Sequence, residues 1–64
     1  MLYKIVYCFT DKYGMIEEAE DGNDLVYIDF YEAKNKSQAV AKLFINERFL
    51  NNPDILQVKE CVNI

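Results

Sequence analysis

The apolar run at residues 2–9 constrains the fold of this chain more than any other segment. It is rich in β-branched and aromatic residues and contains one charge, Lys4, so it predicts a strand. Apolar residues occupy both faces of that strand: Tyr3, Ile5, Tyr7 and Phe9 on one, and Leu2, Val6 and Cys8 on the other. A strand that is apolar on both faces is typical of the inside of a sheet. We therefore expect it to lie between two other strands.

Two later segments predict the flanking strands. Residues 25–33 alternate apolar and polar side chains, and residues 55–64 do so again with Glu60 as the one break. Residues 15–20 are a candidate for a short edge strand. Residues 21–24 predict a turn, because Gly and Asn tolerate positive φ.

A single helix is predicted from Lys36 to about Leu50. The Asn35 side chain can accept a hydrogen bond from the backbone N–H of Gln38, whose own side chain can reach back, as in a capping box. Pro53 ends the segment because proline cannot continue a helix. One face of the helix is apolar: Ala39, Val40, Leu43, Phe44 and Leu50.

These elements predict an α+β fold in one domain, residues 1–64. The expected architecture is a three- to four-stranded, mainly antiparallel sheet in the order β(β)βαβ, with one helix packed on one face. A right-handed strand–helix–strand crossover places the first strand between the other two and antiparallel to both. One helix covers one face only, so the other face of the sheet stays open. A 64-residue chain has a thin margin of stability, which self-association can raise.

We expect Tyr27, Asp29 and Tyr31 to stand in a row on the open face, because Asp29 marks that side of its strand as exposed. The phase of the first strand is not fixed, since both of its faces are apolar. Two interpretations are kept: a surface that tolerates exposed tyrosine, or a surface for a partner or a second copy, where tyrosine is enriched. Base stacking is disfavoured because the neighbouring charge is an acid.

Acidic residues gather around the predicted turn: Glu17, Glu18, Glu20, Asp21 and Asp24. Residues 1–32 carry two lysines and eight acids, whereas residues 33–64 have a net charge of +2. The cluster is either a solvated hairpin that protects an edge strand, or a negative lobe that docks in a basic groove as a phosphate mimic would. A calcium loop is disfavoured because the EF-hand ligand spacing is missing. The net charge of −4 disfavours direct binding to nucleic acid.

The back of the predicted helix carries a third candidate. Ile45 and Phe49 lie opposite the core stripe, where polar residues are expected. Either they form a small contact site, or the helix unwinds near Asn46 and Phe49 tucks inward.

No pattern in the sequence predicts catalysis. The chain has no histidine, and neither Ser37 nor the two cysteines, Cys8 and Cys61, has a local base. We expect a non-enzyme with no metal and no cofactor, and two reduced thiols. Lys4 interrupts the first apolar run, so we expect no signal peptide and no membrane contact, and a cytoplasmic location.

The segments Tyr3–Tyr7, Tyr31–Leu43 and Leu56–Val58 resemble small ββαβ proteins encoded by bacteriophages and prophages, in which a strand and an E-A-x-(S/N)-K motif precede an amphipathic helix. The resemblance implies an inhibitor of the anti-defence or anti-CRISPR type. The expected function is thus an acidic binding protein that blocks a basic, nucleic-acid-handling surface of a host protein. The alternative is a homo-oligomeric module, for example a homodimer, that assembles through the open sheet face or an edge strand.

Overall fold

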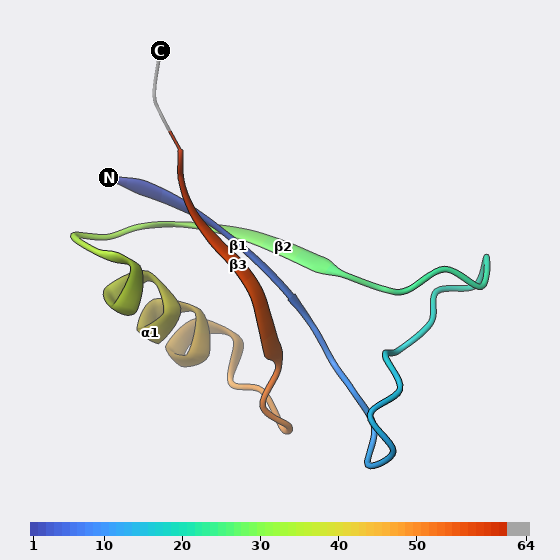
Figure 1. Ribbon diagram of the computed structural model, residues 1–64. Helices are drawn as coiled ribbons and strands as arrows, with labels where there is room; N and C mark the ends of the chain where they lie inside the picture. Colours follow the sequence, from blue (N-terminus) through green and yellow to red (C-terminus); the bar gives the residue numbers. More distant parts are fainter. Residues whose placement is uncertain (62–64) are drawn as a thin grey trace.

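The described residues form a three-stranded antiparallel sheet and one helix. The computed structural model describes residues 1–61, with β1 at Leu2–Cys8, β2 at Tyr27–Glu32, α1 at Lys36–Glu47 and β3 at Asp54–Cys61. The strand order is β2-β1-β3, and β1 is antiparallel to both neighbours. The predicted α+β fold and the central position of the first strand are thus confirmed. Figure 1 shows α1 on one side of the sheet.

The predicted edge strand at residues 15–20 is wrong. This segment makes isolated bridges, Thr10 to Ile16 and Glu18 to Asp24, and forms no strand. Two tight turns with glycines at positive φ, Gly14 and Gly22, fold it back on itself within a few residues. The segment changes its pairing partner between Ile16 and Glu18, so neither bridge extends into a strand.

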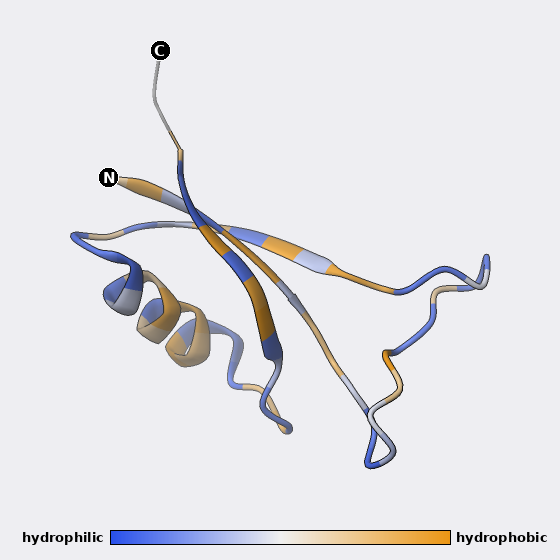
Figure 2. Ribbon diagram, in the orientation of Figure 1, coloured by the Kyte–Doolittle hydropathy of each residue, from blue (hydrophilic) through white to orange (hydrophobic). Residues whose placement is uncertain are grey.

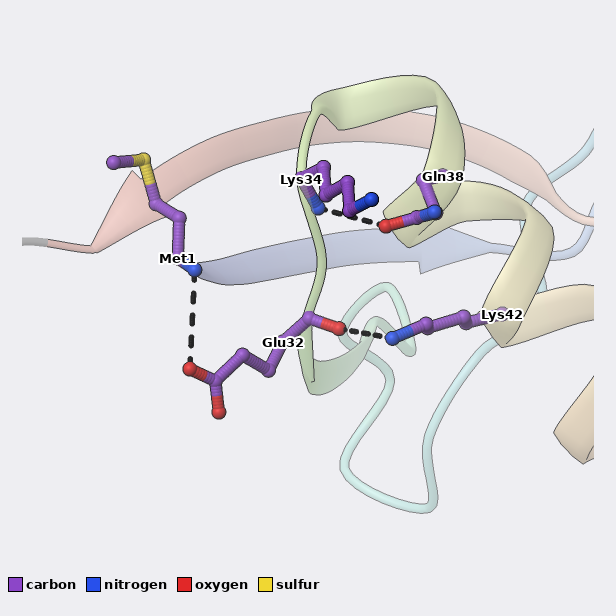
Figure 3. Close-up of polar contacts among 5 residues, drawn as sticks. All are labelled: Met1, Glu32, Lys34, Gln38 and Lys42. Atoms are coloured by element: carbon purple, nitrogen blue, oxygen red, sulfur yellow. Dashed lines mark hydrogen bonds and ion pairs between the residues drawn. The ribbon is translucent and has the colours of Figure 1, made fainter.

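The start of α1 follows the predicted cap. The Asn35 side chain accepts a hydrogen bond from the Gln38 backbone N–H at 2.8 Å, and the Gln38 side chain accepts one from the Lys34 N–H at 2.7 Å. Lys42 adds a bond from its ammonium group to the Glu32 carbonyl oxygen (Figure 3). These bonds tie the end of β2 to the first turns of the helix.

The end of α1 comes earlier than predicted. The helix ends at Glu47, and Arg48 adopts the left-handed conformation with φ 49° and ψ 52°. The chain therefore turns away before Leu50, which is 101% exposed and not part of the core face. The same turn sends Phe49 inward, where it packs against the core.

The core lies between α1 and one face of the sheet. Its buried side chains come from β1, from the segment before the helix and from the helix: Tyr3, Ile5, Tyr7, Ala33, Ala39 and Leu43. Register pairs Tyr3 with Tyr31, Ile5 with Asp29 and Tyr7 with Tyr27, so the β2 residues share that helix-covered face. The expectation that Tyr27, Asp29 and Tyr31 stand on the open face is wrong. Both tyrosines are half-buried and pack against the core.

β3 confirms part of the predicted last strand. Ile55 and Val58 pack against the core, whereas Leu56 is exposed. A register shift opposite Val6 and Tyr7 inserts one extra residue into β3 and breaks the simple alternation. The predicted positions Val62, Asn63 and Ile64 lie outside the described residues.

No described helix is long and apolar enough to span a membrane. Within residues 1–61, no three His, Cys, Asp or Glu side chains are grouped so that they could hold a metal ion.

Both Cys8 and Cys61 are free thiols, and Cys8 is buried. Burial, followed by the nearby Asp54 and Asp24 carboxylates, raises the pKa of the Cys8 thiol.

Candidate interaction surfaces

The loop that joins β1 to β2, residues 9–26, is the first candidate and is called the acidic arm below. It extends beyond the end of the sheet opposite the N-terminus (Figure 1). The arm contains all five carboxylates of the predicted cluster, and every one of them is exposed. Figure 2 shows hydrophilic colouring around its outer turn.

Backbone bonds give the arm a defined shape. Near its base the Glu17 N–H donates to the Phe9 carbonyl at 2.9 Å, and the Leu25 N–H donates to the Glu17 carbonyl at 2.7 Å. Farther out, the Ala19 N–H donates to the Asn23 carbonyl at 2.8 Å. The arm is thus two successive hairpin-like turns joined at Glu17.

Two aspartates have structural roles in those turns. The Asp11 carboxylate accepts from the Tyr13 and Met15 N–H groups, and the Asp21 carboxylate accepts from the Asn23 N–H at 3.0 Å. The backbone bond from Asn23 is the main reason that the pKa of Asp21 is lowered. Asp21 is therefore needed for the turn as well as for its charge.

Glu17 connects the arm to the sheet. The Tyr27 hydroxyl donates to its Oε1 at 2.7 Å, and this bond is the main cause of a raised pKa of Tyr27. Glu17 and Tyr27, both predicted contact residues, are thus brought together. Their hydrogen bond joins the arm to β2 within the chain. Asp29 likewise accepts a 2.6 Å bond from the Tyr7 hydroxyl.

The outer carboxylates of the arm have no cationic partner within the described part of the chain. The one ion pair among residues 1–61 joins the Met1 amino group to Glu32 at 3.8 Å, at the far end of β2 (Figure 3). Glu18, Glu20 and Asp24 therefore project negative charge into solvent, where it acts over about one Debye length, roughly 8–10 Å.

The uncovered side of the sheet is the second candidate and is called the open face below. β2 and the residue before it contribute Val26, Ile28 and Phe30, with exposed fractions of 45%, 49% and 56%. β1 contributes Leu2, Lys4 and Val6, which are half-buried between the flanking strands. Apolar and hydrophilic residues alternate along β2 (Figure 2). Along β1 and β2 the open face is therefore aliphatic and phenyl in character apart from Lys4 and Glu32, and its residues include no tyrosine.

Charges sit at both ends of the open face. Register places Lys4 directly opposite Lys59, two positions from the Val6–Gln57 pair. At the other end Cys8 pairs with Asp54, whose carboxylate accepts a 2.8 Å bond from the Thr10 hydroxyl. Paired residues of neighbouring antiparallel strands share a face, so along β1 and β3 the open face is positive at one end and negative at the other, while Glu32 of β2 lies on the same face beside Leu2.

Ile45 and Phe49, both predicted on the back of the helix, lie in different environments. Ile45 is 70% exposed, as predicted. Phe49 is half-buried and meets Tyr7, Phe9 and Phe44 with ring centroids 5.5–5.7 Å apart. The inward position of Phe49, kept as an alternative above, is the one observed.

Sequence reasoning missed Val26, Ile28 and Phe30 as candidate contact residues. The period-two row of apolar residues is visible in the sequence. Such a row is typical of the core-facing side of a strand, so it is not recognised as an exposed surface. Because Asp29 is charged, the prediction places its side of β2 in solvent, which reverses the two faces of the strand.

No protein family, curated protein or solved structure matches this chain. The two surfaces described above, the acidic arm and the open face, are therefore interpreted from their own geometry and charge.

Proposed function

We propose that this chain is a small, non-catalytic binding protein that docks its acidic arm on a basic surface of another protein. The observation that carries the proposal is the projection of Glu18, Glu20 and Asp24 from a hydrogen-bonded arm, with no cationic partner for them among residues 1–61. Complementary charge speeds and orients the encounter of two proteins. Basic protein surfaces of this kind are used to hold nucleic-acid phosphates.

The preorganised shape of the arm supports the same proposal. A flexible acidic loop loses conformational entropy when it binds, whereas the turns at Asp11 and Asp21 already fix the backbone here. The arm thus presents its carboxylates in one arrangement before a partner arrives. The expected identity as a phage-encoded, anti-CRISPR-type inhibitor stays a prediction, as does the cytoplasmic location.

Parallel affinity capture tests the proposal. The wild-type chain and the E18K/E20K variant are used as baits in a bacterial lysate, with E47K/E60K as a control that changes net charge equally outside the arm. Glu18 and Glu20 are chosen because Glu17 and Asp21 support the fold. We expect basic, nucleic-acid-binding proteins on wild type and E47K/E60K, loss from E18K/E20K, and release by a DNA oligonucleotide.

Capture that is equal for E18K/E20K and wild type, or that DNA fails to compete, excludes docking through the arm. Circular dichroism of all variants checks that the fold is retained.

A further inference from the structure

The open face leaves apolar surface in water that a domain of this size can bury by pairing. Val26, Ile28 and Phe30 form one continuous row along β2, and Val6 lies beside Ile28 in register. Removing apolar area from water is favourable in proportion to that area. A row of this kind on a small chain marks a contact surface more often than chance exposure.

The charges of the open face decide which partner fits. Lys4 and Lys59 are direct cross-strand neighbours, an arrangement that destabilises a single chain. Asp54 lies at the opposite end of the same strand as Lys59; their partners on β1, Cys8 and Lys4, are four residues or about 13 Å apart. The surface has opposite charges at the two ends of β3, and Val6 and Ile28 lie beside Gln57 in the middle row, so the β3 charges are complementary to themselves when the surface is turned end over end.

We propose that the open face is the interface of a two-fold homodimer of this chain. The two-fold axis lies between the stacked sheets, perpendicular to the strands, at the row of Val6, Ile28 and Gln57. Ile28 then meets Ile28 of the second copy, and Phe30 packs over Val26 of that copy. Lys59 of each copy faces Asp54 of the other, which relieves the Lys4–Lys59 repulsion.

Pairing through the sheet edges is disfavoured by the charges there. Both edge strands carry an acid on the helix-covered side, Asp29 on β2 and Glu60 on β3. Two-fold pairing of β2 with β2, or of β3 with β3, brings like carboxylates of two copies close together when the axis lies near these residues. Such inward-pointing charges are a common protection of sheet edges, and the open face has no equivalent in its apolar middle.

The area of the interface predicts a weak dimer. Strand spacing and rise give the open face dimensions of about 14 by 20 Å. Two such faces, each about 280 Å², bury roughly 600 Å² in total, which is below the usual size of a specific interface. We therefore expect a dissociation constant in the high micromolar range, so that dimerisation depends on concentration.

Analytical ultracentrifugation of the full chain at about 5–500 µM tests the dimer. We expect wild type to shift from monomer to dimer across this range. I28K should raise the dissociation constant at least about tenfold, because it places two lysines together on the axis. I45K is the matched control: the same change on the exposed back of α1 should leave the constant unchanged.

A charge-swap experiment tests the end-over-end arrangement. K59E alone brings the new carboxylate against Asp54 of the second copy, and D54K alone brings the new ammonium group against Lys59, so each variant should be monomeric. Mixed in equal amounts, the two should form a heterodimer, because the like-charge contacts within each variant are then replaced by contacts between opposite charges. Neither variant alters Glu18 or Glu20, so this test is independent of the acidic arm.

Three results overturn the inference. Wild type that stays monomeric at the highest concentration excludes the dimer, and the face is then available to another protein. A dimer that I28K leaves intact or that I45K breaks uses another surface. A mixture of K59E and D54K that stays monomeric excludes the proposed axis. Circular dichroism confirms that each variant is folded.

Discussion

The two faces of one sheet differ in composition, and the difference reverses the expectation that polar side chains mark the solvent side. The helix-covered face carries the tyrosines of β1 and β2 and one aspartate, whereas the open face carries Val26, Ile28 and Phe30. Along β2, the polar side chains thus lie on the covered side, and the exposed side carries aliphatic and phenyl carbon.

Hydrogen bonding explains the polar side. The Tyr7 hydroxyl donates to Asp29, and the Tyr27 hydroxyl donates to Glu17, so each phenol buries its ring and satisfies its oxygen at the rim of the core. Among the described residues, no buried side-chain nitrogen or oxygen lacks a partner. The comparison shows that residue polarity does not by itself identify the solvent side of a small sheet.

The largest expected difference in the free energy of unfolding is between substitutions of isoleucine on the two faces. Ile5→Ala on the covered face should lower the free energy of unfolding by about 2–5 kcal/mol, because Ile5 is fully buried. Ile28→Ala on the open face should cost less than about 1 kcal/mol in dilute solution, where the chain is monomeric. Urea denaturation of both variants at low concentration measures the difference.

Equal costs would show that the open face is covered within the monomer. The description of β2 as an uncovered strand would then be wrong, and with it the basis of the dimer.

The next effect concerns the end of the covered face at Phe49. Phe49→Ala should cost about 2–4 kcal/mol, because its ring fills the space between Tyr7, Phe9 and Phe44. Leu50→Ala is the neighbouring control and should change stability by less than about 0.5 kcal/mol, since Leu50 is fully exposed. The reverse order in thermal denaturation would show that the helix continues past Glu47.

Removal of one hydroxyl tests the polar rim. Tyr7→Phe should cost about 1–2 kcal/mol at neutral pH, because Asp29 loses a charge-assisted hydrogen bond. Tyr13→Phe, on an exposed ring, is the control and should have no effect. Urea denaturation at neutral pH measures both variants.

The same variant should alter stability in alkali. Burial, and then the bond to Asp29, raises the pKa of Tyr7, so the folded chain keeps a proton that the unfolded chain loses above pH of about 10. Stability therefore falls as pH rises past that value, and Tyr7→Phe should make the fall less steep. Cys8, Tyr27 and Tyr31 also have raised pKa values, so part of the slope should remain. An unchanged slope would place the Tyr7 hydroxyl in solvent.

Much of the fold could be predicted from periodicity and capping. The apolar character of both faces of β1 placed it at the centre of the sheet, and Asn35 placed the start of α1. These signals are local and strong, because they depend on side-chain spacing and on one capping oxygen.

The features that the sequence does not predict depend on contacts between residues that are far apart in the chain, or on single backbone irregularities. Asp29 was assigned to solvent because the hydroxyl that binds it belongs to Tyr7, 22 residues earlier. The register shift in β3 that exposes Leu56, and the left-handed residue that turns Phe49 inward, also leave no periodic signal. The acidic cluster was found because it is contiguous, whereas the row at Val26, Ile28 and Phe30 was visible but assigned to the wrong side.

The smallest effect concerns the residue that delivers Phe49 to the covered face. Arg48 adopts a left-handed conformation, in which its N–H donates to the Phe44 carbonyl at 3.3 Å. Side chains with a Cβ are strained there, and glycine is the usual residue at such a helix end. Arg48→Gly should therefore raise the free energy of unfolding by about 0.5–1 kcal/mol, after allowance for the greater freedom of glycine in the unfolded chain. Ala41→Gly, at an exposed position inside α1, is the control and should lower it by about 1 kcal/mol in the same urea titration. If both glycines destabilise the chain, Arg48 does not hold this turn, and the inward path of Phe49 needs another cause.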